Sequence, residues 1–260
     1  QASRLAFADR AQYVADPDFV EMPAGNWRSL LDPAYLKLRA QLMGPTSLKQ
    51  TPAGIPLRAQ KSAYAPMSDQ AEFGTSHISI ADAYGNALAM TTTIENAFGA
   101  RQMVYGFLLN NELTDFSFVP QDSQGRLVAN RVQANKRPRS SMSPTLVFDK
   151  ASGELLISAG SPGGEMIIHF TAKTLIGVLH WGMTPQQAID LPNFGALGDP
   201  MVVEEKRFSA ATLQSLRARG AELRELALTS GIQAIVKQPM VGHSKNWISG
   251  TDPRRDGVVL

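Results

Sequence analysis

The chain has 260 residues, of which 43% are hydrophobic, 18% charged and 7% aromatic, and its formal net charge is +2. This composition is typical of a folded globular protein and excludes a disordered chain, while the interspersed charges, without a basic run among aromatic residues, argue against a nucleic-acid groove. The lack of cysteine excludes disulfides, thiolate catalysis and cysteine-ligated zinc, and no apolar stretch approaches the ~20 residues that cross a bilayer.

Residues 1 to about 74 are rich in proline, alanine and loop-forming residues, and they begin at Gln1 without a methionine or a leader. We therefore expect a fragment or a processed piece. Asp32 and Pro33 predict the N-cap and first position of a short helix. Residues 44–74 are expected to be irregular, and so long a connection favours a functional or cleavable segment.

A hairpin is predicted next, with strands at 75–82 and 86–95 around a glycine-containing loop. If Asp82 faces Asn86 across this loop, the apolar residues of both strands share one face. These residues are Ile78, Ile80, Leu88 and Met90. A slip of one residue would destroy that match, so the register is well specified.

The same register gives the hairpin a polar second face. It places Thr75 opposite Thr93 and His77 opposite Thr91, with Glu95 two residues beyond Thr93. The four histidines of the chain are too dispersed in sequence to suggest a metal site, and we assign them as structural.

The rest of the chain alternates strands and helices. We expect a second hairpin at 145–149 and 154–159, a buried helix over 166–180, a short helix capped by Thr184 and Pro185, an amphipathic helix over 209–219, and strands at 232–236 and 247–249.

Several motifs, in this order, resemble the γ-glutamyltransferase family. They are Phe73–Asp82, Gly106–Asn111, Asp115–Ser117, Asn135–Pro144, Gly160–Gly164 and Thr251–Arg254. The resemblance implies an α+β fold, the four-layer αββα sandwich of N-terminal-nucleophile hydrolases. It also implies a precursor that cuts itself before a threonine, with 1–74 as the end of the large-subunit part and 75–260 as the small, catalytic part. The resemblance implies a periplasmic or secreted location, and a cytoplasmic location is the alternative.

Thr75 is the nucleophile that this resemblance implies, once the Gly74–Thr75 bond is cut. A hydroxyl is a weak nucleophile until a base takes its proton. The freed α-amine can be that base, because its pKa is about 7.7 to 8.0, against about 10.4 for lysine. Glycine at position 74 suits a strained scissile site. Without the surrounding motifs, Thr75 would be read as an ordinary strand residue.

Two further groups complete the implied catalytic apparatus. Thr93 is similar to the family's second threonine, which orients the hydroxyl of the nucleophile. Gly163 and Gly164 resemble the glycine pair whose backbone N–H groups stabilise the oxyanion, although such a pair is otherwise only a turn. A serine-hydrolase role for Ser161 is discounted, because Ala159 stands where the Gly-x-Ser-x-Gly elbow requires glycine.

A γ-glutamyl donor carries an α-ammonium and an α-carboxylate, so its pocket needs acids for one and hydroxyl or cationic donors for the other. By resemblance, Glu112 and Asp115 hold the ammonium, and Ser140 and Ser141 bind the carboxylate. Taken singly, each of these residues would be interpreted as an ordinary polar residue of a solvent-exposed loop.

The sequence departs from the family in three places. Glu95 stands where asparagine is common, and we hypothesise that it is partly protonated or paired with a cation such as Arg101. The segment 120–132 is short and lacks the aromatic residue of a lid loop. The family's carboxylate-binding arginine lies upstream of these residues, so we expect an N-terminal large-subunit portion as partner.

The expected function is γ-glutamyl transfer to an amino acid or peptide, or hydrolysis, with glutathione or a similar donor and with neither cofactor nor metal. A cephalosporin acylase-like amidase acting on glutaryl groups is the nearest alternative, and Asp115 argues against it because glutaryl groups carry no ammonium. The second alternative is an inactive, unprocessed precursor fragment or a binding domain.

Overall fold

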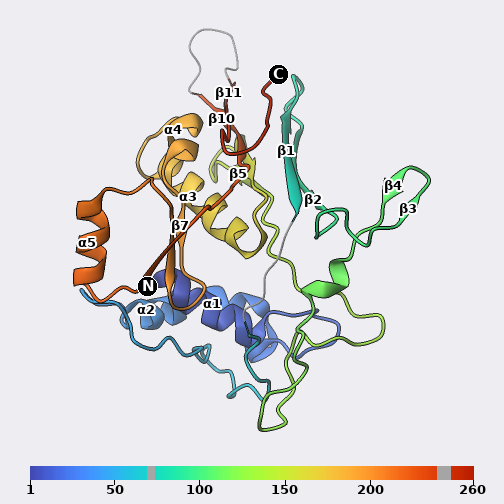
Figure 1. The fold of residues 1–260 in the computed structure, drawn as a ribbon, viewed down its shortest axis with the longest axis vertical. Helices are drawn as coiled ribbons and strands as arrows, with labels where there is room; N and C mark the ends of the chain where they lie inside the picture. Colours follow the sequence, from blue (N-terminus) through green and yellow to red (C-terminus); the bar gives the residue numbers. More distant parts are fainter. Residues whose placement is uncertain (69–73, 239–246) are drawn as a thin grey trace. The chain divides into compact units, whose positions relative to one another are not determined.

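A computed structural model describes residues 1–68, 74–238 and 247–260, and these fold as two compact units (Figure 1). Unit 1 is made from Gln1–Gln70, Glu112–Ser140 and Gly195–Glu225, and unit 2 from Ala71–Asn111, Ser141–Phe194 and Leu226–Leu260. Both units therefore draw on residues from either side of Thr75. The division into 1–74 and 75–260 concerns where the chain is cut, and it stays a prediction.

Unit 1 is built mainly from short helices. Its elements are α1 (Ala2–Tyr13), η1 (Pro23–Gly25), η2 (Trp27–Leu31), α2 (Pro33–Ala40), η3 (Glu112–Asp115), α5 (Ala210–Ala218) and most of a three-stranded sheet of β7 (Phe194–Gly195), β8 (Met201–Glu204) and β9 (Leu223–Leu226). The carboxylate of Asp32 accepts the amides of Ala34 and Tyr35, which confirms the predicted cap. Residues 44–68 contain no helix or strand, as expected.

Unit 2 contains both predicted hairpins and the buried helix. Its elements are β1 (Thr75–Ala81), β2 (Ala87–Thr93), β3 (Met103–Val104), β4 (Phe107–Leu108), β5 (Thr145–Phe148), β6 (Leu155–Gly160), η4 (Gly164–Met166), α3 (Ile167–Leu179), α4 (Pro185–Asp190), β10 (Gln233–Lys237) and β11 (Trp247–Thr251). None of the helices among the described residues is long and apolar enough to cross a membrane.

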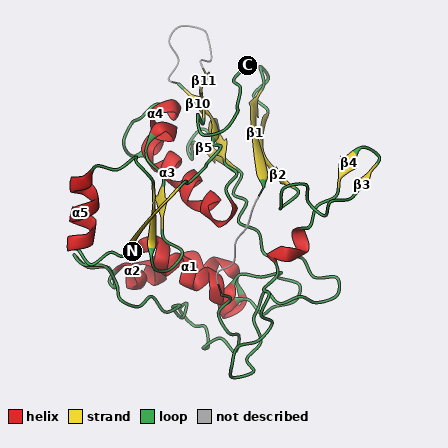
Figure 2. Ribbon diagram, in the orientation of Figure 1, coloured by secondary structure: helices red, strands yellow, loops and turns green. Residues whose placement is uncertain are grey.

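The four antiparallel strands β11–β10–β6–β5 form the central layer of unit 2 (Figure 2). Along β6, Ser158 and Gly160 face the hairpin β1–β2. Ala159, between them, faces the opposite side of the sheet together with its β10 partner Ala234, and this side carries α3 and α4. Because side chains alternate along a strand, the hairpin and the helices cover opposite faces of the sheet. The α+β class is confirmed.

The register predicted for β1–β2 is confirmed, since Thr75 lies opposite Thr93 and Ile80 opposite Leu88. The buried face is nevertheless the polar one. His77 is 7% exposed against the central sheet, whereas the four apolar residues of the other face are 39% to 48% exposed. The structure therefore leaves uncovered the face that an apolar pattern would place inside a core.

Candidate active site

The Gly74–Thr75 peptide lies at the start of β1. Gly74 has a φ of +62°, in the left-handed region that side chains disfavour. A Cβ added there would overlap the carbonyl oxygen of Glu95. Both the backbone conformation and the available space thus require glycine immediately before Thr75.

Thr93 contacts this peptide directly. Its hydroxyl donates a hydrogen bond to the carbonyl oxygen of Gly74 and accepts one from the amide of Glu95 at 2.8 Å. A donor on a carbonyl oxygen draws electron density from the carbon, which makes that carbon a better electrophile. In the uncut chain Thr93 therefore polarises the peptide bond that we expect to be broken, and its role toward the hydroxyl of Thr75 stays a prediction.

Gly163 and Gly164 lie in the loop between β6 and α3, with φ values of +135° and +57°. Together with Gly74 they line a cavity of about 200 Å³. A Cβ at Gly163 would overlap the ring of Phe170, so this loop also requires glycine. The cavity brings the expected oxyanion loop next to the peptide that we expect to be cut. Its other lining residues are Met166, Phe170, Ala227, Leu228, Thr229 and Arg255, none of which the sequence had singled out.

Ser161 lies beside this loop but is fully buried, and its hydroxyl donates to the carbonyl oxygen of Pro162 at 2.6 Å. It also accepts a long hydrogen bond, 3.4 Å, from the amide of Gly231. These contacts tie the glycine loop to the segment that follows β9. These contacts give Ser161 a structural role.

Glu95 is 5% exposed, has a φ of +67°, and accepts a hydrogen bond from the side-chain amide of Asn111 at 2.6 Å. Asn111 also accepts from the amide of Asn96 at 3.0 Å, so it holds the turn after β2. The expected pairing of Glu95 with Arg101 stays a prediction. Asn111 belongs to a motif that carries the family resemblance, and this was the only sequence signal for its role.

The residues expected to bind the donor's α-substituents are divided between the units. Glu112, Asp115 and Ser140 belong to unit 1, and Ser141 to unit 2. Within unit 1 the buried side chain of Asn130 donates to the carbonyl oxygen of Asp115 at 2.7 Å and accepts from the amide of Arg139 at 2.9 Å. Asn130 thereby joins η3 to the backbone that precedes Ser140. The binding roles of these residues stay predictions.

His77 is the titratable group on the buried face of the hairpin. Its ring hydrogen-bonds the hydroxyls of Thr91 at 2.8 Å and Ser79 at 3.1 Å, and it packs against Gly160. Burial lowers the pKa of His77 to about 4, so the ring is neutral at pH 7. Within residues 1–68, 74–238 and 247–260, no three His, Asp or Glu side chains are grouped as a metal site.

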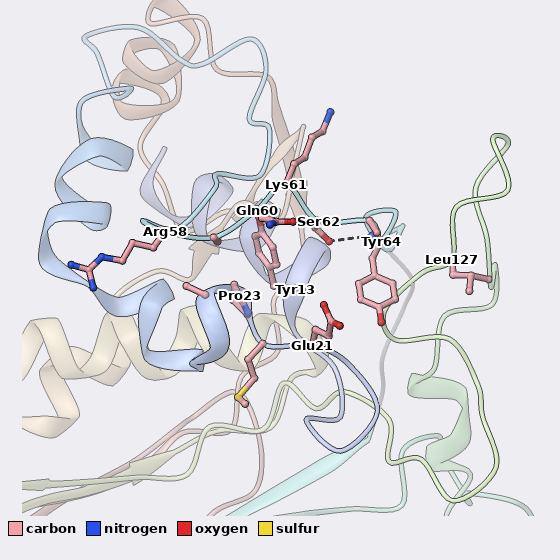
Figure 3. Close-up of a pocket in the computed structure, with 13 residues that line it drawn as sticks. Tyr13, Glu21, Pro23, Arg58, Gln60, Lys61, Ser62, Tyr64 and Leu127 are labelled. Atoms are coloured by element: carbon pink, nitrogen blue, oxygen red, sulfur yellow. Dashed lines mark hydrogen bonds between the residues drawn. The ribbon is translucent and has the colours of Figure 1, made fainter.

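A separate cavity of about 670 Å³ lies in unit 1 (Figure 3). It is bordered by Tyr13, Glu21, Arg58, Lys61 and Tyr64, among others. None of the residues proposed from the sequence lines it. The cavity is therefore not the candidate active site.

Comparison with known proteins agrees with this geometry. The family model described as gamma-glutamyltranspeptidase matches residues 1–260, and the chain belongs to the γ-glutamyltranspeptidase family. The glutathione hydrolase proenzyme of Bacillus subtilis (strain 168) is 40% identical over 200 residues, which cover 74% of this chain and 32% of the relative. The glutathione hydrolase proenzyme of Escherichia coli (strain K12) is 34% identical over 262 residues, 98% of this chain and 42% of the relative.

A solved structure, a mutant of the Helicobacter pylori gamma-glutamyltranspeptidase, superposes with a TM-score of 0.62 at 33% identity. The match covers 69% of this chain and 99% of that one, which confirms the sandwich type expected from the sequence. The chain spans about a third to two fifths of the length of the two curated relatives.

Proposed function

We propose that the whole protein cuts itself between Gly74 and Thr75 and then transfers γ-glutamyl groups to amino acids, peptides or water. One observation carries this proposal: Gly74, whose carbonyl oxygen accepts a hydrogen bond from the hydroxyl of Thr93, lines one cavity together with the loop of Gly163 and Gly164. These are the scissile bond, a polarising donor and the expected oxyanion loop. Family membership supports the same activity.

Self-cleavage begins with the hydroxyl oxygen of Thr75, which adds to the carbonyl carbon of Gly74. The C–N bond then breaks, the proton of the hydroxyl passes to the leaving nitrogen, and an ester is left on Thr75. Water hydrolyses this ester, which releases the new carboxyl terminus at Gly74 and restores the hydroxyl. Thr93 stabilises the charge that develops on the carbonyl oxygen, as its hydrogen bond in the uncut chain indicates.

Cleavage also creates the base for the transfer reaction, because the nitrogen of Thr75 changes from a peptide amide into an amine. The amine takes the proton of the hydroxyl, which attacks the γ-amide of the donor and releases the donor's amine. The backbone N–H groups at Gly163 and Gly164 stabilise the oxyanion, and the γ-glutamyl ester then passes its acyl group to water or to an acceptor amine.

Donor recognition is assigned to the acids and serines expected from the sequence. Glu112 and Asp115, with Glu95, bind the α-ammonium, and Ser140 and Ser141 bind the α-carboxylate. Asp115 and Ser141 are each buried, which argues against assigning either one to a solvated loop.

An N-terminal large-subunit portion completes this proposal. The curated relatives are two to three times as long as this chain. The apolar face of β1–β2 is exposed and made of Ile78, Ile80, Leu88 and Met90, and a contiguous apolar face is typical of an interaction surface. We assign this face to contact with the remainder of the protein.

The cleavage step is tested by mass spectrometry of the full-length precursor. The wild-type protein is expected to yield a fragment that begins at Thr75, and the Thr75→Ala variant is expected to remain intact. Thr92→Ala is the matched control, because Thr92 is a neighbouring, exposed strand hydroxyl outside the site. Cleavage of Thr75→Ala at the same bond would contradict the assignment of the nucleophile.

The substrate class is tested on the cleaved protein with two anilides that differ in one group. The γ-glutamyl anilide carries the α-ammonium and the glutaryl anilide lacks it. We expect faster turnover of the γ-glutamyl compound, and a loss of this preference in Asp115→Asn. Preferential hydrolysis of the glutaryl anilide would instead support the acylase alternative.

A further inference from the structure

The tail that follows β11 returns to the scissile peptide. The guanidinium of Arg255 donates to the carbonyl oxygen of Thr75 at 3.2 Å and to that of Thr229 at 3.5 Å. Arg255 also lines the cavity that Gly74 shares with the glycine loop. An arginine suits two neighbouring carbonyl oxygens, because its planar head presents several donors in fixed directions.

A buried carboxylate fixes the turn that carries Arg255. Asp252 is 1% exposed and accepts hydrogen bonds from the hydroxyl of Ser230 at 2.5 Å and the amides of Ile232 at 3.2 Å and Arg254 at 3.0 Å. Its own carbonyl oxygen accepts the amide of Arg255 at 3.3 Å. The backbone at Arg255 is therefore held before any bond is broken.

The stem of Arg255 is confined as well. A Cβ added at Gly231 would lie 3.0 Å from its Cδ and 2.6 Å from Cγ of Pro162, so these side chains fill the space over this glycine. The guanidinium of Arg255 is exposed, but the aliphatic part of the side chain is packed and its backbone is fixed. The hydrogen bonds of the guanidinium therefore have a defined direction.

Two successive carbonyl oxygens are consequently held by different donors, Gly74 by Thr93 and Thr75 by Arg255. Holding the carbonyl of the peptide to be cut and the carbonyl that follows it limits rotation of the backbone on either side of Thr75, and so restricts how the hydroxyl of Thr75 approaches the carbonyl carbon of Gly74. Small losses of alignment are costly in such intramolecular reactions. We propose that Arg255 is a positioning residue for cleavage of the Gly74–Thr75 bond, an inference that rests on the proposed self-cleavage.

Arg254 has a different role. Its guanidinium donates to the carbonyl oxygens of Ile189 and Leu191, both at 3.1 Å, and to the carboxylate of Asp252, which places it in the support of the turn. A variant of Arg254 would therefore disturb folding. Arg255 is the arginine of this pair whose removal leaves the buried network intact.

The test follows the rate of cleavage in purified full-length precursor by mass spectrometry over time. Arg255→Ala is expected to slow cleavage about tenfold or more, because a charge-assisted hydrogen bond is removed. Arg255→Lys keeps the positive charge on a less directional group, and its cleavage rate is expected to lie between those of wild type and Arg255→Ala. The control is Arg224→Ala, an exposed arginine on β9 of unit 1, which should cleave like wild type.

A second readout separates positioning from general stability. Millimolar guanidinium ion is expected to raise the cleavage rate of Arg255→Ala and to leave that of wild type unchanged, while the thermal midpoints of both stay equal. Slow cleavage with a lowered midpoint and no rescue would overturn the positioning role. If Arg255→Ala were cleaved at the wild-type rate while Thr75→Ala stayed intact, the positioning role would also be overturned. Cleavage of Thr75→Ala would instead contradict the proposed function itself.

Discussion

Two hairpins of unit 2, β1–β2 and β5–β6, have similar sequence patterns but different surroundings. Strand β6 of the hairpin β5–β6 is central in a four-stranded sheet and almost wholly buried, whereas β1–β2 remains a two-stranded ribbon on that sheet. In β1–β2 the pairing of like residues fixed the register, and the rest of the molecule decided which face was covered. Alternation therefore predicts partners across a ribbon better than it predicts the buried side.

Polar contacts attach the ribbon to the sheet. The hydroxyl of Ser158 donates to the carbonyl oxygen of Leu88 at 2.9 Å, and that of Ser79 donates to the carbonyl oxygen of Gln233 at 3.4 Å. His77 fills the space between them and the bare backbone of Gly160. Directional contacts of this kind hold Thr75 and Thr93 at a defined place above the sheet, and they leave the apolar side open.

The largest contrast is expected between two isoleucines. Ile157 of β6 is 2% exposed and Ile80 of β1 is 48% exposed. Ile157→Ala should lower the free energy of unfolding by about 2–5 kcal/mol, whereas Ile80→Ala should cost less than about 1 kcal/mol. Urea unfolding of these 260 residues measures both. Equal losses would show that the apolar face of β1–β2 is covered within this chain.

The second prediction concerns acid. His77 has a pKa of about 4 in the folded state, below its ordinary value of 6.5, so the unfolded chain binds the proton more readily. Stability is therefore fully present above pH 6.5 and is lost as the pH falls toward 4, by at most roughly 3 kcal/mol. The thermal midpoint should fall accordingly over this range.

His77→Gln is the matched variant, because glutamine keeps hydrogen-bonding capacity and does not titrate. Its thermal midpoint should depend less on pH between 6.5 and 4 than that of wild type. Parallel curves for the two proteins would show that another group causes the acid sensitivity.

A smaller effect is expected from Gly160→Ala. The added methyl group would overlap the ring of His77, and overpacking of this kind costs about 1–3 kcal/mol. Gly85→Ala, at a glycine in the β1–β2 turn with open space around it, separates crowding from backbone strain, since only Gly85 has a positive φ of the two. A variant at Gly160 as stable as wild type would mean that the ribbon moves away from the sheet at no cost.

Local patterns made the caps, both hairpins and the long buried helix predictable, because each depends on neighbours in sequence. Helix α1 was missed because it lacks an apolar face: Arg4 and Gln12 are among its buried residues, and Arg4 binds the carbonyl oxygen of Leu48 at 2.6 Å. Strands β3, β4 and β7 have two residues each and were too short to carry a signal.

The same distinction holds for the site. Thr93 and Gly74 meet across one ribbon whose register the sequence specifies, so their proximity could be inferred. Arg255 meets Thr75 across 180 positions of chain, through a turn built around a buried carboxylate. No spacing rule in the sequence reports such a contact.

Gly74 has a consequence for protein engineering. Because the carbonyl oxygen of Glu95 occupies the place of a Cβ at position 74, the turn that follows β2 admits only glycine immediately before Thr75. A foreign leader or purification tag fused directly ahead of Thr75 would have to end in glycine to fit this backbone. The position of Glu95 thus limits which fusions leave the backbone at position 74 unstrained.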